Sequence, residues 1–95
     1  MDAVWIRDYT AASALGLGRA ATRATLEAGR SALTPCRFES AALSTCVGEV
    51  AGVDAVRLPV AHAAYDCRNN RLAQLGLSQD AFAERARERI AHWGA

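Results

Sequence analysis

Apolar and polar positions divide the chain into stretches with different periodicities. The first, Ala3-Val4-Trp5-Ile6, is a short run of mostly β-branched and aromatic residues, bounded by Arg7-Asp8. Such a run predicts a buried β-strand near the start of the chain. Gly16 and Gly18 then interrupt the pattern, and they predict a turn ahead of the next element.

An alanine-rich stretch extends from Arg19 to Ala28. Ala20, Ala24 and Leu26 can share one face of a helix there, and Gly29 follows directly. Glycine is favoured just past a helix C-terminus because it adopts the left-handed backbone conformation without strain. The pattern therefore predicts a helix from Arg19 to Ala28.

The periodicity dissolves between Ser31 and Pro59. This region contains Pro35 and two glycines, with short apolar pieces at Val47–Val50 and Val53–Leu58. Short apolar pieces separated by such breakers are typical of strands joined by turns. We expect extended segments or a loose hairpin here.

Helical spacing returns in the last third of the chain. Asp66 is a suitable N-cap for a helix that continues through Arg71, Leu72 and Leu75. Gly76-Leu77-Ser78 then offers a break, with Ser78 as a fresh N-cap. The sequence therefore predicts two helices in succession.

The second of these helices has the clearest amphipathic pattern. Asp80 suits the positive end of its dipole. Its apolar stripe comprises Phe82, Ala86, Ile90 and Trp93. The polar residues expected to face water are Glu84, Arg85, Arg87 and Glu88. Packing against a core is the favoured interpretation of the stripe, and a groove for a partner is the alternative.

Composition narrows the possible classes of protein. The chain has 95 residues, of which 52% are hydrophobic and 22% charged, and it contains 2 prolines. These values favour a single small domain, residues 1–95, over a disordered or multi-domain chain. The formal net charge of +1 disfavours a nucleic-acid partner.

The three cysteines bear on the cellular compartment. Cys36, Cys46 and Cys67 are odd in number and lack C-x-x-C spacing, so neither a disulfide framework nor a zinc site is indicated. Neither a secretory signal nor an apolar run long enough to span a membrane is recognisable. We expect a cytoplasmic protein without metal or cofactor, and without a membrane partner.

Several residues are candidates for chemistry, and each has a plainer interpretation. Gly16-Leu17-Gly18 completes no phosphate-binding motif and is read as a turn. Cys46 or Cys67 with His62 would be a nucleophile and base if folding joined them, although a small unreactive thiol is more common.

The polar residues near the predicted helices have similar alternatives. His62 and Asp66 are four residues apart, as a pair of metal ligands on a helix can be, but two ligands are too few for a site. Asp66, Arg68 and Arg71 are read as an N-cap with ion-pairing arginines rather than an anion site. His92 is read as a helix-terminal residue.

The order of these pieces resembles the N-terminal part of a β-ketoacyl synthase, a condensing enzyme of the thiolase superfamily. A first strand at Val4-Trp5-Ile6 leads to Ala14-Leu15-Gly16, and a helix then ends in Leu26-Glu27-Ala28-Gly29-Arg30-Ser31, followed by Leu33. The extended region has Pro35, Phe38 and Val47-Gly48-Glu49-Val50, and the third anchor is Asp66-Cys67-Arg68-Asn69-Asn70-Arg71-Leu72-Ala73-Gln74-Leu75.

The resemblance implies an α/β fold, a partial thiolase-like half of one strand, one helix, an extended region and two helices. In the full-length family it implies decarboxylative Claisen condensation on acyl carrier protein, in fatty acid or polyketide synthesis. The family's nucleophilic cysteine lies further along, in an Ala-Cys-Ser-type turn, and two histidines follow it. Cys46 and Cys67 lack that context, so no catalytic residue is carried over.

We therefore interpret the chain as an N-terminal fragment or truncated homologue that does not catalyse alone. The strand expected after Trp93 is missing because the sequence ends at Ala95. The expected partners are a complementary synthase half or a second copy, with acyl carrier protein a partner only of the full-length family. The alternative is a small non-catalytic interaction module that binds another polypeptide.

Overall fold

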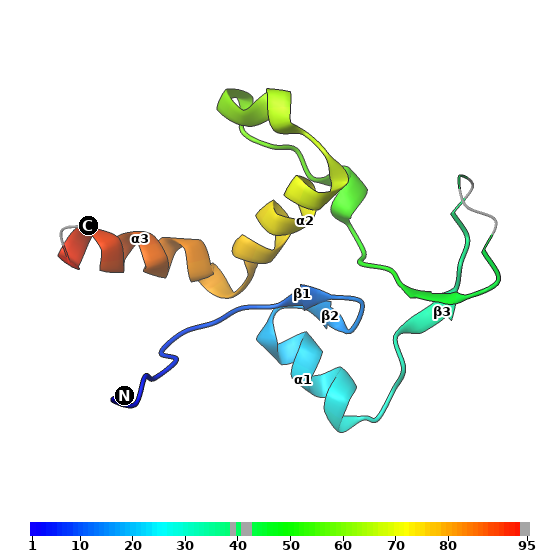
Figure 1. The fold of residues 1–95 in the computed structure, drawn as a ribbon, viewed down its shortest axis with the longest axis horizontal. Coiled ribbons are helices and arrows are strands. Elements are labelled where there is room, and N and C mark those ends of the chain that lie inside the picture. Colours follow the sequence, from blue (N-terminus) through cyan, green and yellow to red (C-terminus); the bar gives the residue numbers. More distant parts are fainter. Residues whose placement is uncertain (39, 41–42, 94–95) are drawn as a thin grey trace.

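The computed structural model describes residues 1–38, 40 and 43–93 as a mixed α/β chain (Figure 1). Its helices are α1 (Arg19–Glu27), α2 (Arg68–Leu77) and α3 (Phe82–Trp93). Its strands are β1 (Ala12–Ser13), β2 (Gly16–Leu17), β3 (Leu33–Pro35) and β4 (Cys46–Gly48). Short 3₁₀ helices are η1 (Val53–Ala55), η2 (Val60–Tyr65) and η3 (Gln79–Ala81).

The strand predicted at residues 3–6 is wrong for this structure. Residues 1–11 have no regular secondary structure, and Val4, Trp5 and Ile6 are 89%, 82% and 86% exposed. A β-strand depends on a neighbouring strand for its backbone hydrogen bonds. None of the described segments pairs with this run, which accounts for its irregular conformation.

The helix that follows is confirmed, but the turn predicted at Gly16-Leu17-Gly18 is displaced, because Gly16 and Leu17 form a strand and the turn lies at Ala14 and Leu15. β1 and β2 form a small antiparallel hairpin, and Gly18 precedes α1 with φ of 87°. At the other end the Gly29 amide donates to the Leu26 carbonyl, and the Arg30 amide donates to the Thr25 carbonyl. These two bonds form a Schellman motif, and the φ of 62° at Gly29 supplies the left-handed residue that it needs.

The loose hairpin predicted after α1 is also confirmed. β3 and β4 are antiparallel, with Thr34 opposite Val47 and Pro35 opposite Cys46. The connection between them includes residues 39, 41 and 42, which lie outside the described part of the chain. The expectation of extended structure throughout Val53–Leu58 is wrong in part, because η1 forms at Val53–Ala55.

The two predicted C-terminal helices form, but their capping differs from expectation. α2 begins at Arg68 with Cys67 as the N-cap residue, and no side chain caps it. Asp66 therefore lies one residue too early, and its carboxylate pairs with Arg71 instead. The Ser78 hydroxyl donates to the Leu75 carbonyl at the end of α2, so it is not an N-cap of α3.

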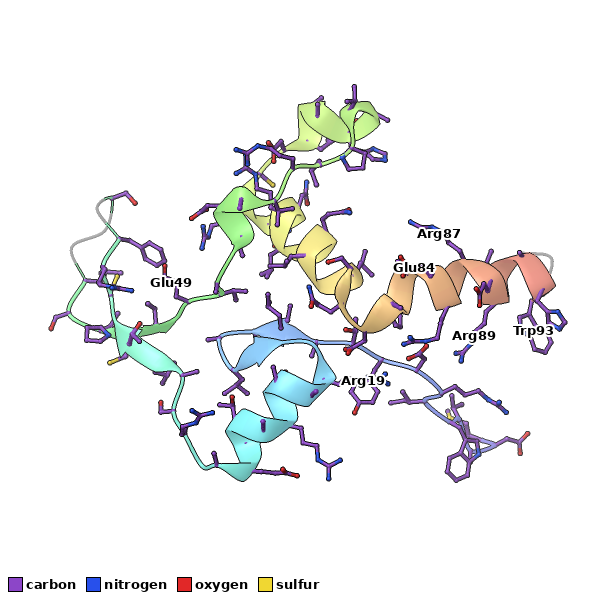
Figure 2. All side chains as sticks on the ribbon, turned by 180° about the vertical axis from the view of Figure 1, so that it is seen from behind. Arg19, Glu49, Glu84, Arg87, Arg89 and Trp93 are labelled. Atoms are coloured by element: carbon purple, nitrogen blue, oxygen red, sulfur yellow. The ribbon has the colours of Figure 1, made fainter. Side chains whose placement is uncertain are left out.

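The apolar stripe of α3 is only partly covered. Phe82 and Ala86 are half-buried, whereas Ile90 and Trp93 are 55% and 79% exposed. The expectation that Arg85 faces water is wrong, because its side chain is 33% exposed and bonds to the N-terminal segment. The covered half of the stripe lies next to the corner with α2, and the exposed half projects beyond it (Figure 2).

The arrangement is open. Val53, at 2% exposed, is the one buried hydrophobic residue among those described. The Cα radius of gyration is 16.6 Å, whereas a compact domain of this length has about 12 Å. The helices and hairpins spread from the β1–β2 turn without enclosing a common core (Figure 1).

Candidate functional site

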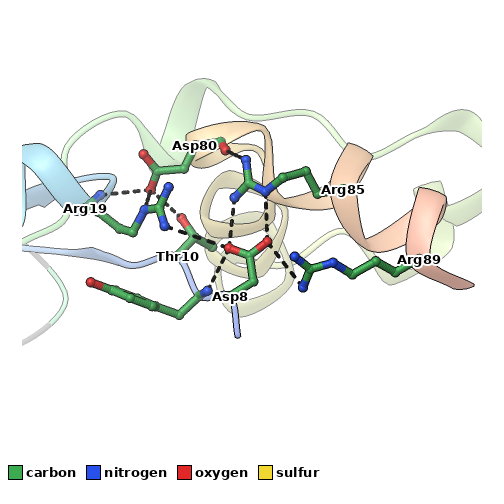
Figure 3. Close-up of polar contacts among 7 residues, drawn as sticks. Asp8, Thr10, Arg19, Asp80, Arg85 and Arg89 are labelled. Carbon is green, nitrogen blue, oxygen red and sulfur yellow. Dashed lines mark hydrogen bonds and ion pairs between the residues drawn. The ribbon is translucent and has the colours of Figure 1, made fainter. Parts of the chain in front are cut away.

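The most densely connected polar cluster joins the N-terminal segment to α3 (Figure 3). We call Asp8, Thr10, Arg19, Asp80, Arg85 and Arg89 the ionic junction. The Arg85 guanidinium donates to both oxygens of Asp8, from Nε to Oδ2 at 2.8 Å and from Nη2 to Oδ1 at 2.9 Å. Two parallel hydrogen bonds of this kind make a bidentate arginine–carboxylate pair, which is one of the strong polar interactions in proteins.

Asp8 is the most enclosed charge of the junction, with its side chain 11% exposed. The guanidinium groups of Arg19 and Arg89 lie 3.8 and 3.9 Å from its carboxylate, and the Tyr9 amide donates to Oδ1. The hydrogen bond from Arg85 is the largest cause that lowers the pKa of Asp8 from 3.8 to about 2. This carboxylate is therefore ionised throughout the physiological range.

Asp80 links the α2–α3 corner to the start of α1. Its Oδ2 accepts the Arg19 backbone N–H at 2.9 Å and the Thr10 hydroxyl at 3.0 Å. The backbone bond from Arg19 is the first cause that lowers the pKa of Asp80. This N–H belongs to the first turn of α1 and has no partner within that helix. Asp80 therefore accepts a hydrogen bond at the start of α1, whereas it was predicted to act at the start of α3.

The corner that presents Asp80 has an unusual backbone. Asp80 and Ala81 have φ angles of 56° and 53°, in the left-handed region that costs most residues free energy. The Asp80 carbonyl accepts a hydrogen bond from Arg85, and its carboxylate is held by Arg19 and Thr10. Several partners therefore hold this conformation in place.

The junction is suited to positioning segments rather than to proton transfer. The carboxylates of Asp8 and Asp80 have lowered pKa values, which makes them weak bases near neutral pH. The Thr10 hydroxyl donates to one of these weak bases, so it lacks the activation that a nucleophile needs. The geometry ties residues 8–10, the start of α1 and α3 together.

A second polar cluster lies at the start of α2 and includes the sequence candidates Asp66, Arg68 and Arg71. Arg71 Nε and Nη2 donate to the two oxygens of Asp66 at 2.6 and 2.7 Å. This pairing is the first cause that lowers the pKa of Asp66 and raises the pKa of Arg71. Arg68 pairs with Asp54 of η1. The ion-pairing interpretation is confirmed, and the capping role of Asp66 is wrong.

The structure does not bring the cysteine and histidine candidates together as a reactive pair. Cys46 lies on β4, Cys67 precedes α2, and His62 lies in η2. His62 lines a shallow hollow of about 340 Å³ with Leu58, Pro59, Tyr65, Asn70, Ala73, Gln74 and Leu77. Neither Cys46 nor Cys67 lines this hollow. His92 lies in the last turn of α3, as expected, with its ring edge-on to Trp93.

Metal ligation finds no support in the part of the chain that is described. No group of three or more His, Cys, Asp or Glu side chains there could hold a metal ion. His62 is in a 3₁₀ helix and Asp66 follows that helix, so the helical four-residue spacing considered for them does not arise.

Among the described helices, none combines the length and apolar character needed to cross a bilayer.

Sequence reasoning missed the ionic junction. Asp8 and Arg85 are 77 positions apart, and Asp80 and Arg19 are 61 apart. The available signals were local ones, namely the acidic residue after the apolar run and the spacing of Arg85 and Arg89 on one face of α3. Neither signal identifies a partner that distant.

Comparisons with models of protein families, with curated proteins and with solved structures gave no match.

Proposed function

We propose that this chain is the N-terminal part of a β-ketoacyl synthase-like protein and that its own contribution is structural. In the complete protein, condensation of acyl and malonyl thioesters on acyl carrier protein would use a cysteine and histidines supplied by another segment. A cytoplasmic location, in fatty acid or polyketide synthesis, belongs to the same proposal.

The single observation that carries the proposal is the amount of surface left uncovered. The chain exposes 7672 Å², whereas a compact monomer of its mass, 10.1 kDa, exposes about 5,300 Å². The excess includes the apolar run Val4–Ile6 and the far half of the α3 stripe. A polypeptide that packs on these faces would complete a core that the chain lacks.

The order of elements gives further support. A helix that ends at a glycine is followed by an antiparallel pair and then by a helix just after Asp66. This is the order in the synthase resemblance, although the first strand is not formed here. The ionic junction is consistent with a positioning role, because it anchors the N-terminal run beside α3 through Asp8 and Arg85.

A direct experiment determines the coding sequence beyond this chain and co-expresses the encoded segment with it. We expect that segment to carry an Ala-Cys-Ser-type turn and two later histidines. Malonyl decarboxylation should appear only when both polypeptides are present. Turnover by the chain alone, lost in Cys46→Ala or Cys67→Ala, would overturn the proposal. An adjoining sequence without such a turn would favour the interaction module.

A further inference from the structure

The corner between α2 and α3 interrupts an apolar stripe that is continuous in the sequence. Apolar residues of α2 and α3 follow one another at spacings of three and four, with one polar member at the corner. In order, the stripe comprises Leu72, Leu75, Gln79, Phe82, Ala86, Ile90 and Trp93. In an unbroken helix of about 3.6 residues per turn, all of them would lie within an arc of about 80°. No proline lies between Arg68 and Trp93, so the sequence permits one continuous helix.

Two residues turn the chain at this corner against their local preference. The backbone at Ser78 and at Phe82 is right-handed helical, whereas Asp80 and Ala81 have φ angles of 56° and 53°. Alanine has the highest intrinsic helix propensity, and the left-handed conformation costs it free energy. Ala81 is also exposed, so packing of its methyl group does not hold it there. The bend therefore needs support from elsewhere in the molecule.

The ionic junction supplies that support. The carboxylate of Asp80 accepts hydrogen bonds from the Thr10 hydroxyl and the Arg19 backbone N–H, at 3.0 and 2.9 Å. The Asp80 carbonyl accepts a bond from the Arg85 guanidinium, which also holds Asp8. Figure 3 shows these bonds converging on the corner from the N-terminal segment and the start of α1. The bend thus depends on segments that lie 70 and 61 positions away in the sequence.

We propose that the α2–α3 corner is a two-state element controlled by residues 8–10. When these residues are docked, the ionic junction holds the bend. When they leave, Asp80 and Ala81 take helical φ angles, and α2 and α3 join into one helix over residues 68–93 with an unbroken apolar stripe. Docking and bending share the same contacts, so each shifts the equilibrium of the other. A molecule that binds residues 8–10 in competition with the junction would straighten the helix.

NMR spectroscopy of the full chain measures the backbone at the corner directly. HN–Hα couplings and Cα chemical shifts report φ at Asp80 and Ala81. Nuclear Overhauser effects between each Hα and the amide of the third residue after it run across the corner only in a continuous helix. The native chain should show positive φ at both residues. Arg85→Gln removes the bonds to Asp8 and to the Asp80 carbonyl, and it should turn both φ angles negative in most of the population.

Three further variants separate this switch from a general effect of the substitution. Arg87→Gln removes the same charge from the same helix, but Arg87 projects from the opposite side of α3 to Arg89 (Figure 2), so the bend should persist. Adding Ala81→Gly to Arg85→Gln should restore the bend, because glycine takes positive φ without strain and disfavours a helix interior. Thr10→Val removes one junction hydrogen bond and leaves α3 intact, so it should shift φ in the same direction by less.

Several results would overturn the proposal. Positive φ at both residues in Arg85→Gln would show that the bend is local, and an irregular corner without helical Overhauser effects would exclude the continuous helix. Failure of Ala81→Gly to restore the bend would do the same. If Arg85→Gln does not fold, Thr10→Val decides: a partial shift to negative φ supports the switch, and an unchanged corner overturns it. The switch does not rest on the proposed function, and the co-expression experiment can succeed or fail independently of it.

Discussion

The Asp8–Arg85 pair should control how the N-terminal segment responds to acid. Folding lowers the pKa of Asp8 from 3.8 to about 2. The folded chain therefore keeps this carboxylate ionised at pH values where the unfolded chain takes up a proton. The resulting stabilisation is present above pH 3.8 and is lost as the pH falls through about 2.

A pair of arginine variants separates the hydrogen bonds from the general positive field. Arg85 donates two bonds to Asp8 at 2.8 and 2.9 Å, and Arg89 only approaches it, at 3.9 Å. We expect Arg85→Gln to move the pKa of Asp8 most of the way back to 3.8, because the Arg85 hydrogen bond is the largest cause of the lowering. Arg89→Gln removes the same charge and should move it much less.

Carbon-detected NMR titration of the aspartate carboxyl groups measures these pKa values directly. A native Asp8 carboxyl that titrates near 3.8 would refute the reasoning, because the bidentate pair would then not persist in solution. Equal shifts in the Arg85→Gln and Arg89→Gln variants would show that overall charge, rather than the hydrogen bonds, lowers the pKa.

Three further predictions follow from local geometry. Gly29→Ala should destabilise the chain by about 1–2 kcal/mol in urea unfolding followed by circular dichroism, because φ is 62° there. Val53→Ala should cost about 1.5 kcal/mol in the same assay, since it removes two carbons from a residue that is 2% exposed; an unchanged midpoint would contradict either expectation. Iodoacetamide should label Cys46 and Cys67 near neutral pH no faster than a peptide cysteine, and rapid labelling that His62→Ala abolishes would reveal a reactive pair.

Local sequence signals predicted the helices and the hairpin well. The glycine after residue 28 ends α1 through its own backbone conformation, and the apolar spacing of α3 is a property of the helix itself. The strand at residues 3–6 was wrong because strand formation needs a partner, and no described segment supplies one. β-Propensity indicates what can pair, not whether a partner is present.

The predicted capping residues also show that a local sequence signal does not determine which partner a residue finds. Asp66 and Asp80 are each of a residue type that is favoured near the start of a helix. Asp66 pairs with Arg71 instead, and Asp80 accepts the Arg19 N–H of a helix 61 positions earlier. A capping preference is local, whereas the choice among competing donors depends on tertiary contacts that sequence spacing does not specify.

The central claim is that this chain is an incomplete packing unit whose apolar faces need another polypeptide. Urea unfolding of the native chain and Phe82→Ala, at concentrations where both are monomeric, tests it most directly. Phe82 and Ala86 are half-buried, and Ile90 and Trp93 beyond them are exposed. We expect a broad transition that Phe82→Ala hardly changes. A sharp monomeric transition that loses about 3–5 kcal/mol in the variant, as a complete core would, would contradict it.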